Sequence, residues 1–210
     1  MSGHTKFLII AAVALAATAA NAADCSRLMM PAGADQPLPT AKPDQQVFGK
    51  SVLYFTNRAR CDAGLQAMDF DSSLTAMSAT HSDNMAAEKL MSHKTSARGQ
   101  QTLAKRKRAF RVRASSVAEN IGQNYVYAIA KHSIRTGAKD CAFTYAATGA
   151  TVPRHSYAMM AQAVVEQWLG SSGHRANIMT PQFDRMGAGF AIAPEPQTCG
   201  RVYATQNFAG

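Results

Sequence analysis

The segment 168–179 reads Trp-Leu-Gly-Ser-Ser-Gly-His-Arg-Ala-Asn-Ile-Met, and it decides more about the fold than any other stretch. Met160, Val164 and Trp168 recur at helical spacing before it, so we expect a helix from about residue 156 to residue 169. The residues Ser171-Ser172-Gly173 favour helix ends and turns, and the helix should stop there. The segment therefore joins an inward-facing tryptophan to a polar turn that carries His174.

Two earlier helices are expected. Apolar residues recur at steps of three and four from Val47 to Ala59, and this helix should end near Gly64, which can adopt the left-handed stop conformation. A second helix should begin at residue 71 or 72. Its stripe consists of Leu74, Met77, His81, Met85 and Glu88. For a histidine on such a stripe, a core or cleft-wall role is a better interpretation than a ligand role.

The remaining elements are expected to be strands and loops. Residues 94–118 are polar and basic without a clear period, and a short extended piece at 117–121 leads into a weaker helical pattern near 123–134. Met186–Ala193 and Val202–Phe208 are strand-like runs. Helices flanking a small antiparallel sheet indicate a layered α+β domain.

Several short motifs along the chain resemble those of a known protein family. They are Asn57-x-x-Arg60-x-x-x-Gly64-Leu65, His81-Ser82-x-x-Met85-Ala86, Ser92-His93, Glu119-Asn120-Ile121, the tryptophan segment and Gly187-x-Gly189. In this order over residues 47–208, they resemble bacterial members of the CAP superfamily (cysteine-rich secretory protein, antigen 5 and pathogenesis-related-1, the SCP domain). The resemblance implies an α-β-α sandwich with a small antiparallel sheet between helical layers, and a solvent-open cleft.

The resemblance also implies a charged cleft built from histidines and acids. Three of its positions correspond to His93, Glu119 and His174. The second acidic position of animal members corresponds here to Ser171, and bacterial relatives commonly have a small polar residue there. We therefore expect His93, Glu119 and His174 to converge in one cleft, together with Ser171 and His81.

Two imidazoles and a carboxylate are also the side chains that bind Zn²⁺ in open catalytic sites. His93, His174 and Glu119 are therefore possible metal ligands, since some relatives hold a divalent metal at paired histidines. The alternative is that no cofactor is required and that these groups hydrogen-bond one another to fix the cleft walls. A Gly-x-Ser-x-Gly elbow, which would favour a serine hydrolase, is absent from the sequence.

The N-terminal residues 1–22 indicate a signal peptide. Lys6, an apolar run over 7–19 and Ala20-Asn21-Ala22 form the pattern that export and cleavage require, and the run is shorter than the ~20 residues of a membrane span. No later stretch comes closer to such a span. We expect a flexible Pro-rich leader over 23–46 and the CAP domain over 47–210, with an enlarged loop region at about 123–155. The protein should be exported, to the periplasm or outside the cell.

Four cysteines, at positions 25, 61, 141 and 199, predict two disulfides, because an even number of cysteines in an exported protein is typical of paired thiols. Three pairings are possible. We favour Cys25–Cys61 with Cys141–Cys199, since the latter two lie in late loops and Cys25 can fold back from the leader.

The net charge of +9 includes a dense basic run. Its cations are Lys105, Arg106, Lys107, Arg108, Arg111 and Arg113, interleaved with Phe110 and Val112. Such a run is usually a solvated face, but this density also favours binding to an anionic polymer, lipid or cell-wall surface. Nucleic acid is not an expected partner outside the cell, and the oligomeric state is not indicated by the sequence.

The expected function is that of a binding or effector module. It would engage an envelope, wall-polymer or lipid partner through the His/Glu cleft and the basic run. One rival is a metal-dependent hydrolase or peptidase that uses His93, His174 and Glu119, although we lean away from an enzyme. A sterol or fatty-acid carrier is the other rival, and an apolar groove beside the cleft would favour it.

Overall fold

The computed structural model describes residues 25–39, 41–130, 132–137 and 141–210. The signal peptide expected over 1–22 lies outside the described residues. The helices are η1 (Cys25–Arg27), α1 (Gln45–Asp62), α2 (Ser72–Glu88), α3 (Leu103–Ala109), α4 (Tyr157–Leu169) and α5 (Ser172–Ile178). The strands are β1 (Asp69–Phe70), β2 (Val117–Tyr125), β3 (Ile134–Gly137), β4 (Ala142–Tyr145), β5 (Arg185–Ala193) and β6 (Arg201–Ala209).

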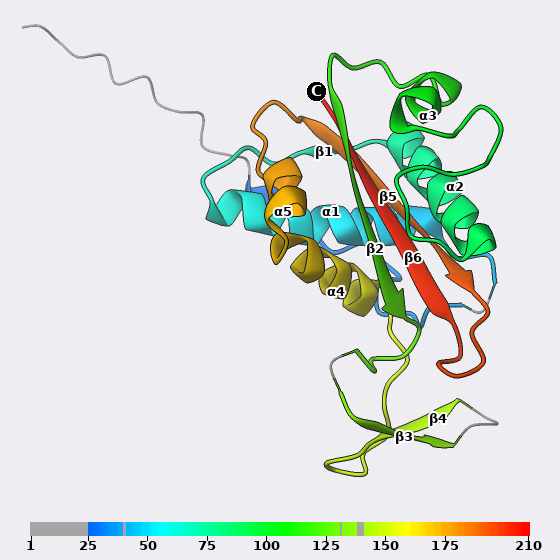
Figure 1. Cartoon of the computed structure of the whole chain (residues 1–210). Coiled ribbons are helices and arrows are strands. Elements are labelled where there is room, and N and C mark those ends of the chain that lie inside the picture. Colours follow the sequence, from blue (N-terminus) through cyan, green and yellow to red (C-terminus); the bar gives the residue numbers. More distant parts are fainter. Residues whose placement is uncertain (1–24, 40, 131, 138–140) are drawn as a thin grey trace, which may run out of the picture.

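The elements form three layers, with helices on both faces of a four-stranded sheet (Figure 1). The strand order is β1-β5-β6-β2, in which β5–β6 and β6–β2 are antiparallel and the short β1 pairs parallel with β5. α1, α4 and α5 lie on one side of the sheet, while α2 and α3 lie on the other. The α-β-α sandwich implied by the motifs is therefore confirmed.

An apolar core fills the space between the sheet and the α1/α4 layer. Trp168 is fully buried in it, and its indole N–H donates to the carbonyl of Ile121 at 3.0 Å. Ring pairs extend this core, with Phe48 and Phe190 centroids 4.6 Å apart. The tryptophan of the deciding segment thus fastens α4 to the outer edge of β2.

On the other face, α2 packs directly against β5. A Cβ atom at Gly187 would overlap the backbone of Leu74 and Thr75, and one at Gly189 would overlap Ala79. The Gly-x-Gly motif is therefore required by the close approach of helix and strand. This close approach packs the buried side of α2, which includes His81, directly against the sheet.

The expected helix boundaries are confirmed by their caps. Asp44 accepts hydrogen bonds from the first amides of α1, and Asp71 does the same for α2. Gly64 follows α1 with φ at +73°, a left-handed conformation that suits glycine. Ser156 caps α4 by accepting from the amide of Met159.

The Pro-rich leader differs from expectation, because its described residues pack against the domain instead of extending freely. Ala34 and Leu38 are 3% and 1% exposed. The amide of Leu38 donates to the carbonyl of His155 at 2.9 Å, and the amide of Ala158 donates to Ala34. The prolines remove amide donors, but the apolar side chains between them can still be buried beside the start of α4.

The helix expected near 123–134 is wrong. β2 continues to Tyr125, because residues 123–125 pair with residues 201–203 of β6. The chain then leaves the sheet and forms the β3–β4 hairpin, which projects from the end of the sandwich (Figure 1). Cross-strand pairing outweighs a weak helical pattern here.

Both favoured disulfides, Cys25–Cys61 and Cys141–Cys199, are present. The first ties the leader to the end of α1, and the second ties the excursion after β2 to the β5–β6 loop. Both fit an exported protein, since disulfides persist in oxidising compartments. Among the described residues, no helix combines the length and hydropathy needed to cross a bilayer.

Candidate functional site

Glu119 is the centre of the candidate cleft. β2 is an edge strand, and alternation along it sends the side chains of Glu119 and Asn120 to opposite faces of the sheet. Asn120 is on the α5 side, where its amide donates to the carbonyl of His174. Glu119 is on the α2/α3 side, with its residue only 6% exposed. A carboxylate this deeply buried requires partners.

Three side chains surround this carboxylate. The Nδ1 atom of His93 lies 2.9 Å from Oε1 of Glu119, and the imidazole of His93 is more than half exposed. Nη2 of Arg106 is 2.7 Å from both oxygens. Nε2 of His81 lies 3.5 Å from Oε1. The structure therefore brings together His93, Glu119 and His81, and it adds an arginine.

Arg106 corrects an expectation, because it is not a surface cation. Its side chain is fully buried, and its guanidinium also donates to the carbonyls of Gln100 and His93. It is held there by α3, a short helix in a segment where no period was expected. Leu103, Arg106 and Phe110 are spaced three and four residues apart, and this spacing was the signal that could have revealed the helix.

Phe110 and Val112 also have a structural explanation. They pack with Leu74 and Met77 of α2 in a small apolar cluster, with Val112 8% exposed. These two side chains hold the segment on the domain and are not available for a lipid surface. Of the remaining cations, Lys105 and Arg108 on α3 and Arg111 and Arg113 after it are exposed.

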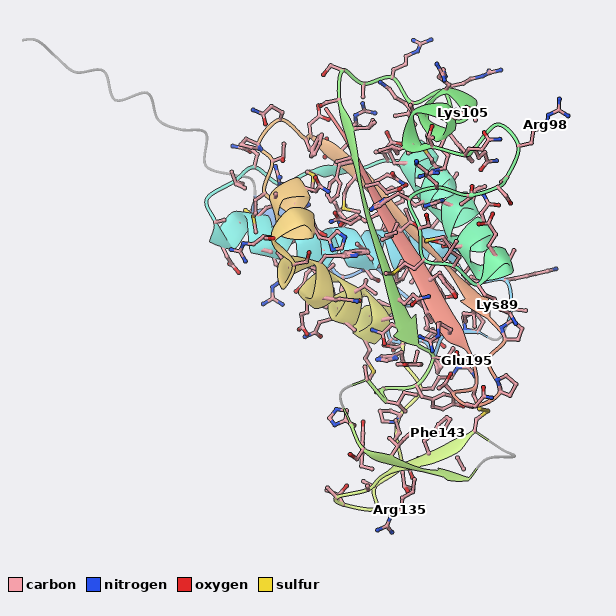
Figure 2. The ribbon with its side chains drawn as sticks, viewed as in Figure 1. Lys89, Arg98, Lys105, Arg135, Phe143 and Glu195 are labelled. Atoms are coloured by element: carbon pink, nitrogen blue, oxygen red, sulfur yellow. A yellow bond between two sulfur atoms is a disulfide. The ribbon has the colours of Figure 1, made fainter. Side chains whose placement is uncertain are left out.

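The exposed cations Lys105, Arg108, Arg111 and Arg113 are called the basic patch below. Lys107 is only partly exposed, and its ammonium donates to the carbonyl of Ala114 at 2.6 Å. Figure 2 shows Arg98 pointing away from the domain in the loop before α3, and the ammonium of Lys105 donates to the side chain of Gln101 at 3.1 Å. The basic patch thus borders the loop that carries His93.

The charges in the cleft follow from burial and neighbours. The pKa of His81 is lowered to about 4, chiefly by burial; the charge of Glu119 opposes this shift, while the charges of Arg106 and His93 add to it. His81 is therefore neutral at pH 7, and its contact with Glu119 is not an ion pair. Burial would raise the pKa of Glu119, but the His93 hydrogen bond and the charge of Arg106 outweigh it and leave that pKa lowered.

His174 occupies the α5 side of the cleft. Burial and the charge of His93 lower its pKa, which places it within electrostatic reach of His93. In the described part of the chain, no hydrogen bond joins its ring to His93 or Glu119. Ser171 is the N-cap residue of α5 but makes no capping hydrogen bond with its side chain. A hydrogen bond thus joins His93 to Glu119, whereas none within the described residues joins His174 or Ser171 to this pair.

The arrangement does not fit a zinc ligand set. Both oxygens of Glu119 are held by Arg106, whose positive charge already neutralises the carboxylate. The described residues contain no group of three or more His, Cys, Asp and Glu side chains placed to hold a metal ion. The guanidinium of Arg106 therefore already binds the carboxylate oxygens that a metal ion would need as ligands.

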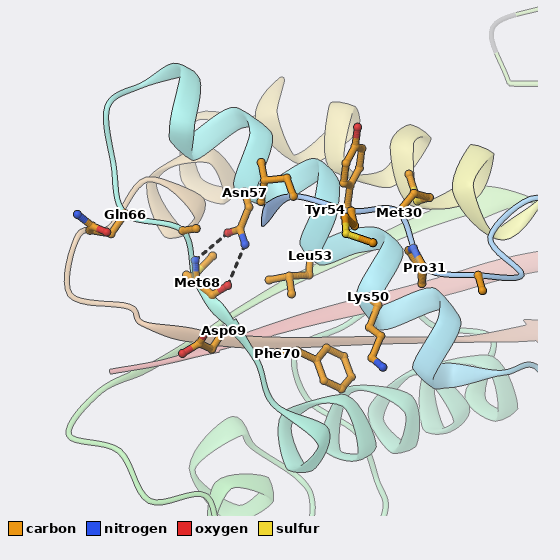
Figure 3. Close-up of a pocket in the computed structure, with 14 residues that line it drawn as sticks. Met30, Pro31, Lys50, Leu53, Tyr54, Asn57, Gln66, Met68, Asp69 and Phe70 are labelled. Atoms are coloured by element: carbon orange, nitrogen blue, oxygen red, sulfur yellow. Dashed lines mark hydrogen bonds between the residues drawn. The ribbon is translucent and has the colours of Figure 1, made fainter. Parts of the chain in front are cut away.

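A large apolar groove lies elsewhere in the molecule. It has a volume of about 630 Å³ and is lined by the leader, α1 and the residues around β1 (Figure 3). The amide of Asn57 in its wall is engaged by the backbone of Met68, with two bonds of 2.8 Å. β1 and β2 are opposite edges of the sheet, so this groove is not beside the cleft. The carrier hypothesis gains no support from it.

The comparisons with known proteins agree with the fold. A family model described as the cysteine-rich secretory protein family, CAP, matches residues 53–208. No protein with a curated description matches the sequence at a significant level. Among solved structures, an outer surface protein from Borrelia burgdorferi is similar, with 12% identity and a TM-score of 0.51 over 81% of this chain and 98% of that one.

Two further structures cover this chain to a similar extent. One is an extracellular SCP-domain protein from Bacillus anthracis, 20% identical with a TM-score of 0.49. The other is a cysteine-rich secretory protein from Staphylococcus aureus, 16% identical with a TM-score of 0.46. Each alignment covers 80% of this chain, which spans 45% and 41% of the two longer chains respectively. At these identities the similarity concerns the fold.

Proposed function

This chain belongs to the CAP family, and from that premise we propose that it is an exported binding module for an anionic surface, through the cleft and the basic patch. The proposal is based on the opposite directions of the basic side chains on and just after α3. Arg106 turns inward and neutralises Glu119, while the four cations of the basic patch remain in solvent. The outer side of α3 is left strongly positive, as an anionic partner requires.

The partner class follows from where such a protein works. Two disulfides indicate an oxidising compartment, where acidic polysaccharide, wall polymer and lipid head groups supply negative surfaces. A surface of clustered cations gains about 1 kcal/mol per Lys or Arg near an anionic membrane. The exposed ring of His93, at the mouth of the cleft, would contact the same partner.

A hydrolase is the second candidate, and the His93–Glu119 contact favours it. A carboxylate that accepts a hydrogen bond from Nδ1 of a histidine fixes the tautomer and leaves Nε2 as a possible base. A nucleophile is needed as well, and no hydrogen bond within the described residues joins Ser171 to this pair. Binding therefore fits the cleft better than catalysis.

The binding proposal is tested with a triple variant, Lys105→Gln/Arg108→Gln/Arg113→Gln. Glutamine keeps the helical propensity of α3. Arg111 is left in place because its φ is +53°. The matched control is Arg58→Gln/Arg135→Gln/Arg175→Gln, which removes the same charge from exposed positions on other elements. Retention on heparin and on mixed phosphatidylcholine–phosphatidylserine vesicles is measured for both.

We expect the patch variant to bind roughly a hundredfold more weakly than wild type, and the control to change far less. Wild-type binding should also weaken steeply as salt is added. Equal elution of the two variants would show that only net charge matters and would reject the basic patch as a site. Hydrolysis of a peptide or ester substrate that is lost in His93→Ala would favour the second candidate.

A further inference from the structure

A separate cavity of about 530 Å³ lies beside the point where the chain leaves β2. One wall is the end of β2, residues 123–125, and another is formed by the returning excursion, which supplies His132 and His155. The third wall is a face of α4. Its lining residues are Ala163, Glu166, Gln167 and Gly170. Their spacing of three, four and seven puts them on one side of the helix, so the cavity is a coherent surface.

His155 offers a fixed hydrogen-bond acceptor to this cavity. Its Nδ1 atom lies 3.0 Å from the carbonyl of Tyr125, and because a carbonyl only accepts, Nδ1 must carry the proton. Burial lowers the pKa of His155, so the ring is neutral at pH 7 and, with the proton on Nδ1, Nε2 is the accepting nitrogen.

The rim of the cavity is rich in groups that pair with hydroxyls. Glu166 is exposed and accepts from Gln162 through Oε1 at 2.8 Å, which leaves Oε2 available. The amide of Gln167 lies over Gly122, where a Cβ atom would be 3.3 Å from Oε1 of Gln167. Glycine at position 122 therefore leaves room for this amide beside β2. Ser171 adds a hydroxyl at the far end of α4.

The floor is small and apolar, and two rings stand beside it. Alanines at positions 128, 130 and 163 hollow the surface. The ring of Tyr125 is fixed by the guanidinium of Arg201, 4.8 Å from its centroid, and His132 packs edge-on against Tyr145. Rings held in place with planar amides and a carboxylate nearby form a surface with apolar and hydrogen-bonding parts.

We propose that this cavity binds a neutral saccharide unit. Sugar hydroxyls both donate and accept hydrogen bonds, which matches the amide of Gln167, the carboxylate of Glu166 and the unprotonated Nε2 of His155. The C–H faces of a sugar pack well on aromatic rings and alanines. The site is distinct from the cleft, since Tyr125 is six residues beyond Glu119 on β2, or roughly 20 Å at ~3.4 Å per residue. The proposal goes beyond the anionic partner, because it assigns an uncharged ligand to a different surface.

The test is a titration of the isotope-labelled, disulfide-bonded protein with triacetylchitotriose, cellotriose and maltotriose, followed by amide chemical shifts. We expect at least one sugar to shift the signals of Tyr125, His155 and Gln167. Replacing an exposed rim group, in Gln167→Ala or Glu166→Gln, should weaken this binding about three- to tenfold, the usual effect of one lost hydrogen bond. Gln46→Ala, an exposed glutamine on α1, is the control and should leave affinity unchanged.

Three results would overturn the proposal. They are the absence of shifts with all three sugars at millimolar concentration, shifts centred on His93 and Glu119, and equal weakening in Gln167→Ala and Gln46→Ala. A sulfated heparin disaccharide that displaced the sugar from the same residues would also contradict it, by showing an anion site. Heparin retention of the patch variant is measured separately, so this proposal and the binding proposal can fail independently.

Discussion

Among the residues that the structure describes, two arginines are fully buried, and their positive charges are stabilised in different ways. Arg60, at the end of α1, donates to the carbonyls of four residues: Gln66, Ile178, Thr180 and Phe183. The described residues place no carboxylate within ion-pair distance of it. Arg106 instead pairs with Glu119 at 2.7 Å. The two sites lie on opposite faces of the sheet.

The difference teaches which arginine is structural and which shapes the cleft. Arg60 binds carbonyls at the end of α5 and in the chain that leads to β5, so it joins α1 to the start of the last hairpin. Carbonyl dipoles at a helix C-terminus favour a cation, and this arrangement has no counter-ion that could be lost on protonation. Arg106 holds a carboxylate ionised beside two histidines, where charge can change with pH.

Replacing Arg60 should have the largest effect on stability. In Arg60→Met the carbonyls of Ile178 and Phe183 lose their donors while buried, and two further carbonyls lose theirs while partly buried. At about 1–3 kcal/mol for each buried unsatisfied group, the total loss should reach about 5 kcal/mol. That is comparable with the whole stability of a typical domain, so little folded protein is expected. Urea unfolding followed by circular dichroism measures it.

Arg60→Lys provides the control, because an ammonium retains the charge and three donors but not the planar geometry. It should recover part of the loss. If Arg60→Met unfolds within about 1 kcal/mol of wild type, the carbonyl cage is not the structural joint described above.

Replacing Arg106 should cost less, about 3–5 kcal/mol, because Arg106→Met leaves Glu119 buried without its cation. Unlike the carbonyls around Arg60, this partner can be changed as well. Glu119→Gln removes the unpaired charge, so the double variant should be more stable than Arg106→Met alone. Urea unfolding of the four proteins gives the coupling. Additive losses would show that the two residues do not stabilise one another.

Acid should distinguish the two sites further. His81 has an ordinary pKa of 6.5 that is lowered to about 4 in the fold, so its contribution to stability is present above pH 6.5 and lost as the pH falls to about 4. At 1.36 kcal/mol per pKa unit, roughly 3 kcal/mol should be lost. The lowered pKa of Glu119 adds a loss below its ordinary value of 4.5. Measuring the free energy of unfolding at several pH values from 7 to 4 tests this expected loss of stability.

His81→Gln should remove most of that slope, since glutamine does not titrate. The losses due to His155 and His174 should remain, because their pKa values are lowered as well. A slope that is unchanged in His81→Gln would mean that the acid sensitivity arises outside the Arg106 site.

An exposed arginine should have the smallest effect. Arg108 is two residues from Arg106 on α3 but faces solvent. Arg108→Met should change the free energy of unfolding by less than about 0.5 kcal/mol, as surface substitutions usually do. A loss as large as that in Arg106→Met would show that α3, and not the buried pair, is the source of both effects.

The helices around the tryptophan segment, the late strands and both disulfides could be predicted from the sequence. Their signals are local: helical spacing, a helix start at residue 71 or 72, and an even number of cysteines. Glu119 and His93 could be assigned by motif order. The packed leader, the extension of β2 to Tyr125 and the helix α3 could not, because each depends on a surface that another part of the chain provides.

The sequence by itself thus determined that this is a CAP domain and which acid and histidine form its cleft pair. Only the tertiary structure decided that one arginine of a basic run turns inward and neutralises Glu119. The physical reason is that six neighbouring cations have equal charge and differ only in direction. The direction of each side chain depends on how α3 packs against α2 and on the buried carboxylate of Glu119. Neither can be deduced from the basic run alone.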